Sequence, residues 1–256
     1  MVKVKPEIIY FDQELIILDK PPNLSVTRSQ TEKLPSLQDY LEKKFNLKIA
    51  RRAGLVHRLD KDTSGVIAAA RTQESFEFLQ KQFAQRLVSK KYTALVHQIP
   101  KFATFATNLS IGRHKFGKFG ISATGRVSQT SFSVLKKFEF GQTFLPILDQ
   151  FSKNWQRYFE SNAKFYSLLE VEPKTGRTHQ IRVHAKSAGH PVVADPLYLP
   201  RKLAKFDQKF CQRLFLHAAS LTFTHPKTGK PVTFEAPLPN DLQDALEYLK
   251  EMTNAN

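Results

Sequence analysis

The sequence predicts a single α+β domain in which a mixed, mostly antiparallel sheet is flanked by helices and loops. Short apolar segments separated by turn residues recur along the chain, a pattern typical of strands. Three other segments carry apolar residues at helical spacing. The 256 residues, 41% hydrophobic and 24% charged, suffice for one large core. We therefore expect one domain over residues 1–256, with a surface insertion at 141–163.

These signals give the following elements in chain order. Residues 8–22 predict two short strands around a turn at 12–14, ended by a proline pair. A helix at 36–45 should follow the N-cap Ser36, with Asp39 at its third position, and a second helix at 73–88 should follow Thr72. Further strands are expected at 54–59, 66–70, 91–97, 128–135, 165–171, 178–184, 214–223 and 231–234, and a last amphipathic helix at 241–251.

Two similar segments, PKTGR at 173–177 and PKTGK at 226–230, each stand between strand-like runs. We interpret both as hairpin turns. The insertion at 141–163 interrupts the rhythm of short strands, and we expect it to be partly helical around Trp155 and Phe159.

Net charge is the most informative total. The chain has 39 Lys and Arg against 23 Asp and Glu, a formal charge of +16, which favours a polyanionic partner. Simple solubility is the alternative. The excess is concentrated at 101–157, where Arg113, Lys115 and Lys118 alternate with Phe116 and Phe119. This composition could track phosphates and stack bases, although buried phenylalanines would give the same pattern.

Other partners and cofactors are not expected. The single cysteine, Cys211, excludes an internal disulfide and a cysteine-based zinc site, and we expect it to be buried. No apolar run is long enough for a membrane span, and no secretory signal begins the sequence, so we expect a cytoplasmic protein. The histidines of 174–184 diverge in strand alternation, which argues against a metal. A monomer is the default expectation.

The densest charged motif is H57-R-L-D-K-D-T-S-G65. If 54–60 is a strand, Arg58 and Asp60 lie on one face and His57 and Leu59 on the other. The following turn would place Asp60 at a strand end, where a carboxylate can meet a ligand. A surface ion pair is the structural alternative for Arg58 and Asp60, and a structural role is expected for His57.

Two further segments carry candidate site residues. In 174–184, strand alternation groups Gln180, Arg182 and His184 on one face. An inward Arg182 needs a carboxylate partner, since an unpaired buried charge costs about 3 to 5 kcal/mol, and Asp60 is the candidate. The expected strand at 90–96 places Tyr92 beside Lys90 and Lys91.

In this order the segments resemble the RluA-like RNA pseudouridine synthases. H57-R-L-D-K-D-T-S-G-V66 is similar to the family's catalytic signature, K90-K-Y-T-A-L95 to its tyrosine strand, and G176-R-T-H-Q-I-R-V-H184 with G189-H-P-V-V-A-D-P-L-Y198 to its arginine strand and following loop. The resemblance also includes IIYFDQELIILDKP from residue 8 and LFLHAASLTFTHPKTG from residue 214. It covers nearly the whole chain except 141–163.

The resemblance implies a pseudouridine-synthase catalytic domain and cofactor-free isomerisation of uridine in RNA. Asp60 would be the nucleophile or base, with sugar and base both open as its point of attack. Arg58 would fill the space of the extruded nucleotide, and Ile181 would also contact substrate. Tyr92 would lie against the flipped base and assist proton movement at carbon 5, and Arg182 would pair with Asp60. The RNA-binding candidates are Lys90, Lys91, Arg113, Lys115, Lys118 and Arg177.

Departures from the family pattern bear on the RNA target. Ala53 stands where the family usually has proline, and Ala194 where it usually has glycine. Only seven residues precede the first matching strand, which predicts no small N-terminal RNA-binding module, so the catalytic domain with 101–157 would select the RNA. Large-subunit ribosomal RNA is favoured, with transfer RNA possible.

Two other classes of protein are compatible with parts of this sequence. A catalytically lapsed RNA-binding or ribosome-assembly factor is the alternative function. The segment D62-T-S-G65 resembles the loops of aspartic proteases, but Ser64 intervenes before the glycine and no second loop exists.

Overall fold

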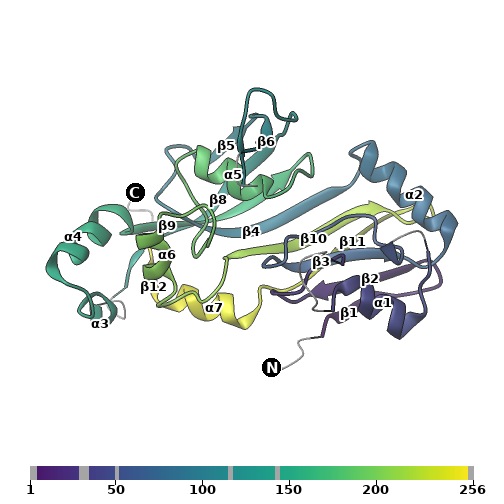
Figure 1. The fold of residues 1–256 in the computed structure, drawn as a ribbon, viewed down its shortest axis with the longest axis horizontal. Helices are drawn as coiled ribbons and strands as arrows, with labels where there is room; N and C mark the ends of the chain where they lie inside the picture. Colours follow the sequence, from purple (N-terminus) through teal and green to yellow (C-terminus); the bar gives the residue numbers. More distant parts are fainter. Residues whose placement is uncertain (1–4, 29–34, 50–51, 115–117, 142–144, 253–256) are drawn as a thin grey trace. The chain divides into compact units, whose positions relative to one another are not determined.

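The computed structural model describes residues 5–28, 35–49, 52–114, 118–141 and 145–252. By its internal contacts the chain divides into two compact units, Met1–Lys91 with His217–Pro237, and Tyr92–Leu216 with Leu238–Asn256. Figure 1 labels the helices and strands of both units. The expectation of a single domain over 1–256 stays a prediction.

The first unit is built on strands in the order β1-β2-β3-β10, with β11 paired to β10. β3 and β10 pair in parallel, His217 opposite Ser64, and the other pairs are antiparallel. Its elements are β1 (Glu7–Phe11), β2 (Leu15–Lys20), α1 (Leu37–Phe45), β3 (Ser64–Ala70), α2 (Gln73–Ala84), β10 (Leu216–Thr224) and β11 (Pro231–Glu235).

The second unit has the strand order β4-β9-β8-β12, with β5 paired to β8 and a separate β6–β7 ribbon. All of these pairs are antiparallel. Its elements are β4 (Ser89–His97), β5 (Thr104–Thr107), β6 (Ile111–Arg113), β7 (Phe119–Ile121), β8 (Thr130–Phe140), α3 (Leu145–Leu148), α4 (Lys153–Asn162), β9 (Phe165–Pro173), α5 (Gln180–Ser187), α6 (Arg201–Asp207), α7 (Asn240–Glu247) and β12 (Leu249–Glu251). The predicted α+β class with a mostly antiparallel mixed sheet is confirmed.

Local capping chemistry sets the helix starts as expected. Ser36 and Asp39 form a reciprocal capping box at the start of α1, which satisfies backbone donors at that end. The Thr72 hydroxyl accepts a hydrogen bond from the Ser75 amide at the start of α2. α2 stops at Ala84, short of the expected residue 88, and Arg86 beyond it has a positive φ of 61°, which helical backbone does not allow.

Four sequence predictions are wrong in detail. Residues 54–59 form a loop with a single bridge from Leu55 to Ala69, and residues 180–184 of the expected strand 178–184 belong to the helix α5. PKTGR leads from β9 towards α5, whereas PKTGK joins the antiparallel pair β10 and β11 as a hairpin. The last helix ends at Glu247, and β12 follows it.

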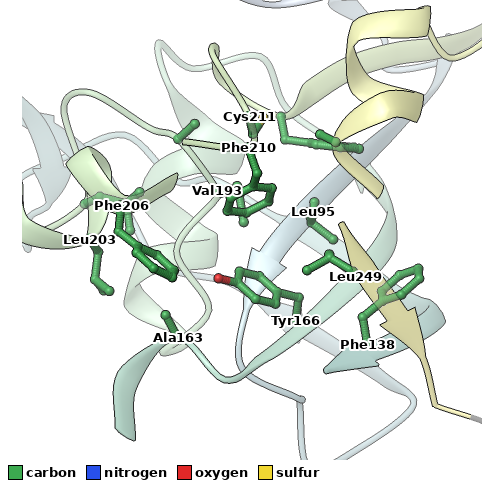
Figure 2. Close-up of a cluster of buried hydrophobic side chains, with 14 of the residues drawn as sticks. Leu95, Phe138, Ala163, Tyr166, Val193, Leu203, Phe206, Phe210, Cys211 and Leu249 are labelled. Atoms are coloured by element: carbon green, nitrogen blue, oxygen red, sulfur yellow. The ribbon is translucent and has the colours of Figure 1, made fainter. Parts of the chain in front are cut away.

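The segment 141–163 is helical where expected and contributes to the core. Phe159 of α4 is fully buried and stacks on Phe206 of α6, with ring centroids 4.0 Å apart. Figure 2 shows Tyr166, Phe206 and Cys211 in the same hydrophobic cluster. Cys211 is buried as expected, and burial raises the pKa of its thiol to about 12, so it is not a reactive thiolate.

Candidate functional site

The signature at 57–65 is presented by a loop of the first unit. At Gly54 the backbone has a φ of +76°, and a Cβ there would lie 2.0 Å from the Ala70 carbonyl oxygen. The chain therefore passes against the end of β3 without forming a ladder, and Arg58 and Asp60 do not share a strand face. Arg58 is exposed and Asp60 is partly exposed, while Leu59 between them is buried.

His57 fixes this loop to β3. Its Nε2 accepts a hydrogen bond from the Ala68 amide at 3.0 Å, and its ring stacks on Phe83 at 4.8 Å between centroids. Burial, with a smaller contribution from the Lys90 charge, lowers the pKa of His57 to about 3. The neutral ring thus keeps its acceptor nitrogen near neutral pH, which supports the structural interpretation of His57.

A buried lysine ties the other end of the loop to β2. The Lys20 ammonium is fully buried and donates to the carbonyls of Pro21, Leu24 and Lys61 at 2.8, 3.0 and 3.0 Å. Three donors thus meet three acceptors, which offsets the cost of removing a charge from water. The Thr63 amide also donates to the Asp60 carbonyl at 3.2 Å, which closes a turn directly after the aspartate.

Contacts at the end of the signature explain why it contains Ser64 and Gly65. The Ser64 hydroxyl lies 2.9 Å from Nδ1 of His217, whose Nε2 lies 3.1 Å from the Ala236 carbonyl. Gly65 has a φ of +115°, and a Cβ there would lie 2.2 Å from the Ala218 carbonyl oxygen. Only glycine permits this close approach of β3 to β10.

In the second unit, Arg182 lies on α5 and forms a buried ion pair. Its Nε and Nη2 donate to the two carboxylate oxygens of Asp195, both at 2.7 Å, and both residues are at most 2% exposed. Asp195 also accepts from the amides of Leu197 and Tyr198. The carboxylate that a buried Arg182 needs is supplied by Asp195, for which the sequence predicted no such role.

These two hydrogen bonds to Asp195 use two of the five N–H groups of the Arg182 guanidinium. Because Asp60 belongs to the first unit and Arg182 to the second, their pairing stays a prediction.

A second buried acid orients the loop that carries Asp195. Asp207 Oδ2 accepts from the Ala194 amide at 2.8 Å and lies 2.9 Å from His97 Nε2. Ala194 has a φ of +55°, a conformation that glycine adopts more readily. These contacts hold the residue before Asp195 in place. No sequence motif marked Asp207.

The other polar residues of α5 are structural. The Gln180 amide donates to the Gln129 carbonyl and the Thr130 hydroxyl, and its oxygen accepts from the Thr175 hydroxyl and the Arg177 amide. Burial lowers the pKa of His184, which favours its neutral ring. Its Nδ1 lies 2.9 Å from the Thr130 hydroxyl and its Nε2 lies 2.9 Å from the Leu109 carbonyl oxygen. The strand grouping of these side chains with Arg182 was wrong, because a helix presents them.

Tyr92 and Ile181 meet in one hydrophobic cluster. Tyr92 opens the second unit on β4 opposite Val171 of β9, and it packs against the cluster that contains Ile181. Ile181 is 6% exposed. The contacts of both residues with substrate stay predictions.

The RNA-binding candidates are spread over both units. Lys90 and Lys91 are partly buried at the start of β4, and Arg113 and Lys118 are exposed on the β6–β7 ribbon. Arg177 is partly buried beside Val127, and Lys115 lies outside the described residues. Phe119 packs against the cluster of Ile111, Val183 and Tyr198.

In the part of the chain that the structure describes, no helix is both long enough and apolar enough to cross a membrane. In the same residues, no group of three or more His, Cys, Asp or Glu side chains is placed to hold a metal ion.

Comparison with known proteins identifies the class to which this fold and loop belong. The family model described as RNA pseudouridylate synthase matches residues 14–187. The chain is 33% identical over 251 residues to the uncharacterized RNA pseudouridine synthase YlyB of Bacillus subtilis, covering 96% of this chain and 73% of that protein. It is 31% identical over 245 residues to ribosomal large subunit pseudouridine synthase C of Vibrio vulnificus, covering 95% and 69%.

The chain therefore belongs to the RluA-like RNA pseudouridine synthases, and it is an isomerase. The solved structure of human RNA pseudouridylate synthase domain containing 1 has the same fold, with a TM-score of 0.71 at 23% identity over 97% of this chain and 89% of that one. The expected family and enzyme class are confirmed.

Proposed function

We propose that this pseudouridine synthase acts in the cytoplasm on large-subunit ribosomal RNA, with Asp60 as the residue that engages the flipped uridine. The observation that carries the proposal is the anchoring of the signature loop. Lys20 and His57 hold its two ends to β2 and β3, and between them Leu59 is buried while Arg58 and Asp60 reach the surface. A fixed loop of this kind positions a reactive carboxylate.

The reaction that this loop would perform is balanced without a cofactor. The bond from N1 of uracil to C1′ of the ribose breaks, the base rotates, and a bond from C5 to C1′ forms. The proton on C5 leaves and N1 gains a proton, so no electrons are exchanged. Asp60 would serve as nucleophile or base, and Arg58 would occupy the space left by the extruded nucleotide.

Tyr92 would lie against the base and assist the proton transfer at C5. Arg182 would pair with Asp60 and help to orient its carboxylate.

Similarity to a named relative and the net charge support the proposed class of RNA. The Vibrio vulnificus relative is named for the ribosomal large subunit. The net charge of +16 favours any RNA partner, so transfer RNA is the second candidate.

Release of tritium from RNA labelled at C5 of uridine tests the proposal. We expect release from ribosomal RNA by the wild type and essentially none by Asp60→Asn. Asp62→Asn is the matched control, because it makes the same change two residues away in the same loop, and it should keep the activity. RNA binding should survive in both variants and weaken steeply with salt.

Two results would contradict this reading. Full activity of Asp60→Asn would remove the aspartate from the mechanism. Wild-type binding without release from ribosomal or transfer RNA would favour a lapsed RNA-binding or ribosome-assembly factor. Mapping of pseudouridines with and without the gene would identify the uridine.

A further inference from the structure

A basic surface lies on the second unit, on helices α4 and α6. It carries five exposed cations, Lys153 and Arg157 on α4 and Arg201, Lys202 and Lys205 on α6. Glu160 is the one exposed acid on these two helices, because Asp207 is fully buried beside His97. We call these five cations the α4–α6 face. With five exposed cations and one exposed acid, this face is positively charged, as are surfaces that attract polyanions.

The two helices are fixed next to one another by aromatic packing. Phe206 of α6 stacks on Phe159 of α4 with centroids 4.0 Å apart, and Phe151 packs against both rings. The Gln156 amide donates to the carbonyls of Leu148 and Phe151, which holds α4 to the segment before it. Helices α4 and α6, labelled in Figure 1, therefore carry these cations from adjacent positions in the fold.

Aromatic rings lie among the cations of this face. The Lys202 ammonium lies 5.0 Å from the ring centroid of Trp155 and 5.4 Å from that of Tyr158. Both rings are only partly buried. A cation over an aromatic face is held in position, and partly exposed rings beside lysines are the composition of surfaces that bind nucleic-acid backbones and stack bases.

We propose that the α4–α6 face binds the sugar–phosphate backbone of the substrate RNA. This inference rests on the proposed function and names a surface through which the enzyme selects its RNA. Helix α6 lies outside the 101–157 segment that the charge count singled out. The structure brings Lys202 of α6 over the rings of Trp155 and Tyr158 on α4.

The chemistry of the face favours RNA over a protein or a membrane. Among the described residues, none of the exposed large hydrophobic side chains lies on α4 or α6. A membrane-binding helix would present such side chains to the bilayer, and a protein interface would centre on them. Phosphate contacts by lysine and arginine require none.

The test compares two variants of equal charge change. Arg157→Gln, Lys202→Gln and Lys205→Gln are combined on the face. The matched control combines Lys43→Gln, Lys48→Gln and Lys81→Gln, three exposed lysines of the first unit. The probe is deproteinised large-subunit ribosomal RNA, and its Kd is measured by filter binding over a series of potassium chloride concentrations.

We expect the face variant to bind about 10- to 100-fold more weakly near 0.1 M salt, and the slope of log Kd against log salt to fall by about 2 to 3. The control should stay within about twofold of the wild type. In the tritium assay the face variant should raise KM and keep kcat.

Trp155 gives a second, local readout, because it is the single tryptophan of the chain. Excited at a wavelength that RNA does not absorb, its emission should be quenched as the RNA saturates the wild type. Two outcomes would overturn the proposal and leave the face to a protein partner. Both variants could lose the same amount of RNA affinity, or the face variant could bind RNA as tightly as the wild type while RNA leaves the Trp155 emission unchanged.

These readouts separate the two proposals. Absence of tritium release by the wild type would defeat the proposed function, while Kd, salt slope and Trp155 emission would still decide the role of the face.

Discussion

Lys20→Met should weaken both the fold and the presentation of Asp60. Methionine keeps an unbranched apolar chain at this fully buried position but removes the ammonium. The carbonyls of Pro21, Leu24 and Lys61 then lose their charged donor. A buried acceptor left without a partner costs about 1 to 3 kcal/mol.

The size of the effect follows from where these acceptors lie. Pro21, Leu24 and Lys61 are only partly buried, so water can reach the carbonyls in part and the cost for each falls near the lower limit. Three of them give a loss of about 2 to 4 kcal/mol in the free energy of unfolding. This is a large share of the roughly 5 to 15 kcal/mol that a protein of this kind has.

Urea denaturation and tritium release measure the two consequences. The free energy of unfolding should fall by the amount above, and kcat should fall about 10- to 100-fold at a temperature where the variant remains folded, because the loop after Asp60 is no longer held. Lys43→Met, on the exposed side of α1, should change stability by less than about 0.5 kcal/mol. Unchanged stability would refute the anchoring, and lowered stability with unchanged kcat would refute its link to Asp60.

Three further predictions follow from single contacts. The folded-state pKa of His57 is about 3, below the usual value of 6.5, so its contribution to stability is present above pH 6.5 and is lost as pH falls towards 3. In urea titrations, the free energy of unfolding of His57→Gln should therefore fall by about 1 kcal/mol less between pH 7 and 5.5 than that of the wild type. An equal fall in both proteins would contradict this. Ala53 has a φ of +51°, so Ala53→Pro, the residue usual in the family, should cost about 3 kcal/mol or more, while Ala53→Gly should change the urea midpoint little; a stable Ala53→Pro would refute the positive φ. Asp195→Asn should lower the free energy of unfolding by about 3 kcal/mol, because it leaves the Arg182 charge buried without its carboxylate; a loss below 1 kcal/mol would mean that other groups neutralise Arg182.

The parts of the fold that the sequence predicted are those set by local chemistry. Ser36 with Asp39, and Thr72, mark the starts of α1 and α2 because their side chains cap the first turn. PKTGK joins two strands that pair directly, with Gly229 at a positive φ. In each case the residues that determine the element lie within a few positions of it.

The sequence did not predict helix α5 because the buried surroundings of α5 remove the usual helical repeat of polar and apolar residues. All residues from Gln180 to Ala185 are buried, so no polar face repeats every three to four residues. The β-branched Ile181 and Val183 favour a strand locally. Burial of the polar side chains is possible because Gln180, Arg182 and His184 each find partners elsewhere in the second unit.

The partners of the two buried cations could not be predicted for a related reason. Lys20 is bound by backbone carbonyls, which every residue type carries, so no sequence pattern identifies them. Arg182 pairs with Asp195, for which the sequence predicted no role, and the loop that carries Asp195 is held by the contact between Ala194 and Asp207. The signature H57-R-L-D60 thus contains Asp60, the residue proposed to react, while Lys20 outside the signature holds the loop that carries it. A change at Lys20 should therefore affect Asp60 while the signature itself stays intact.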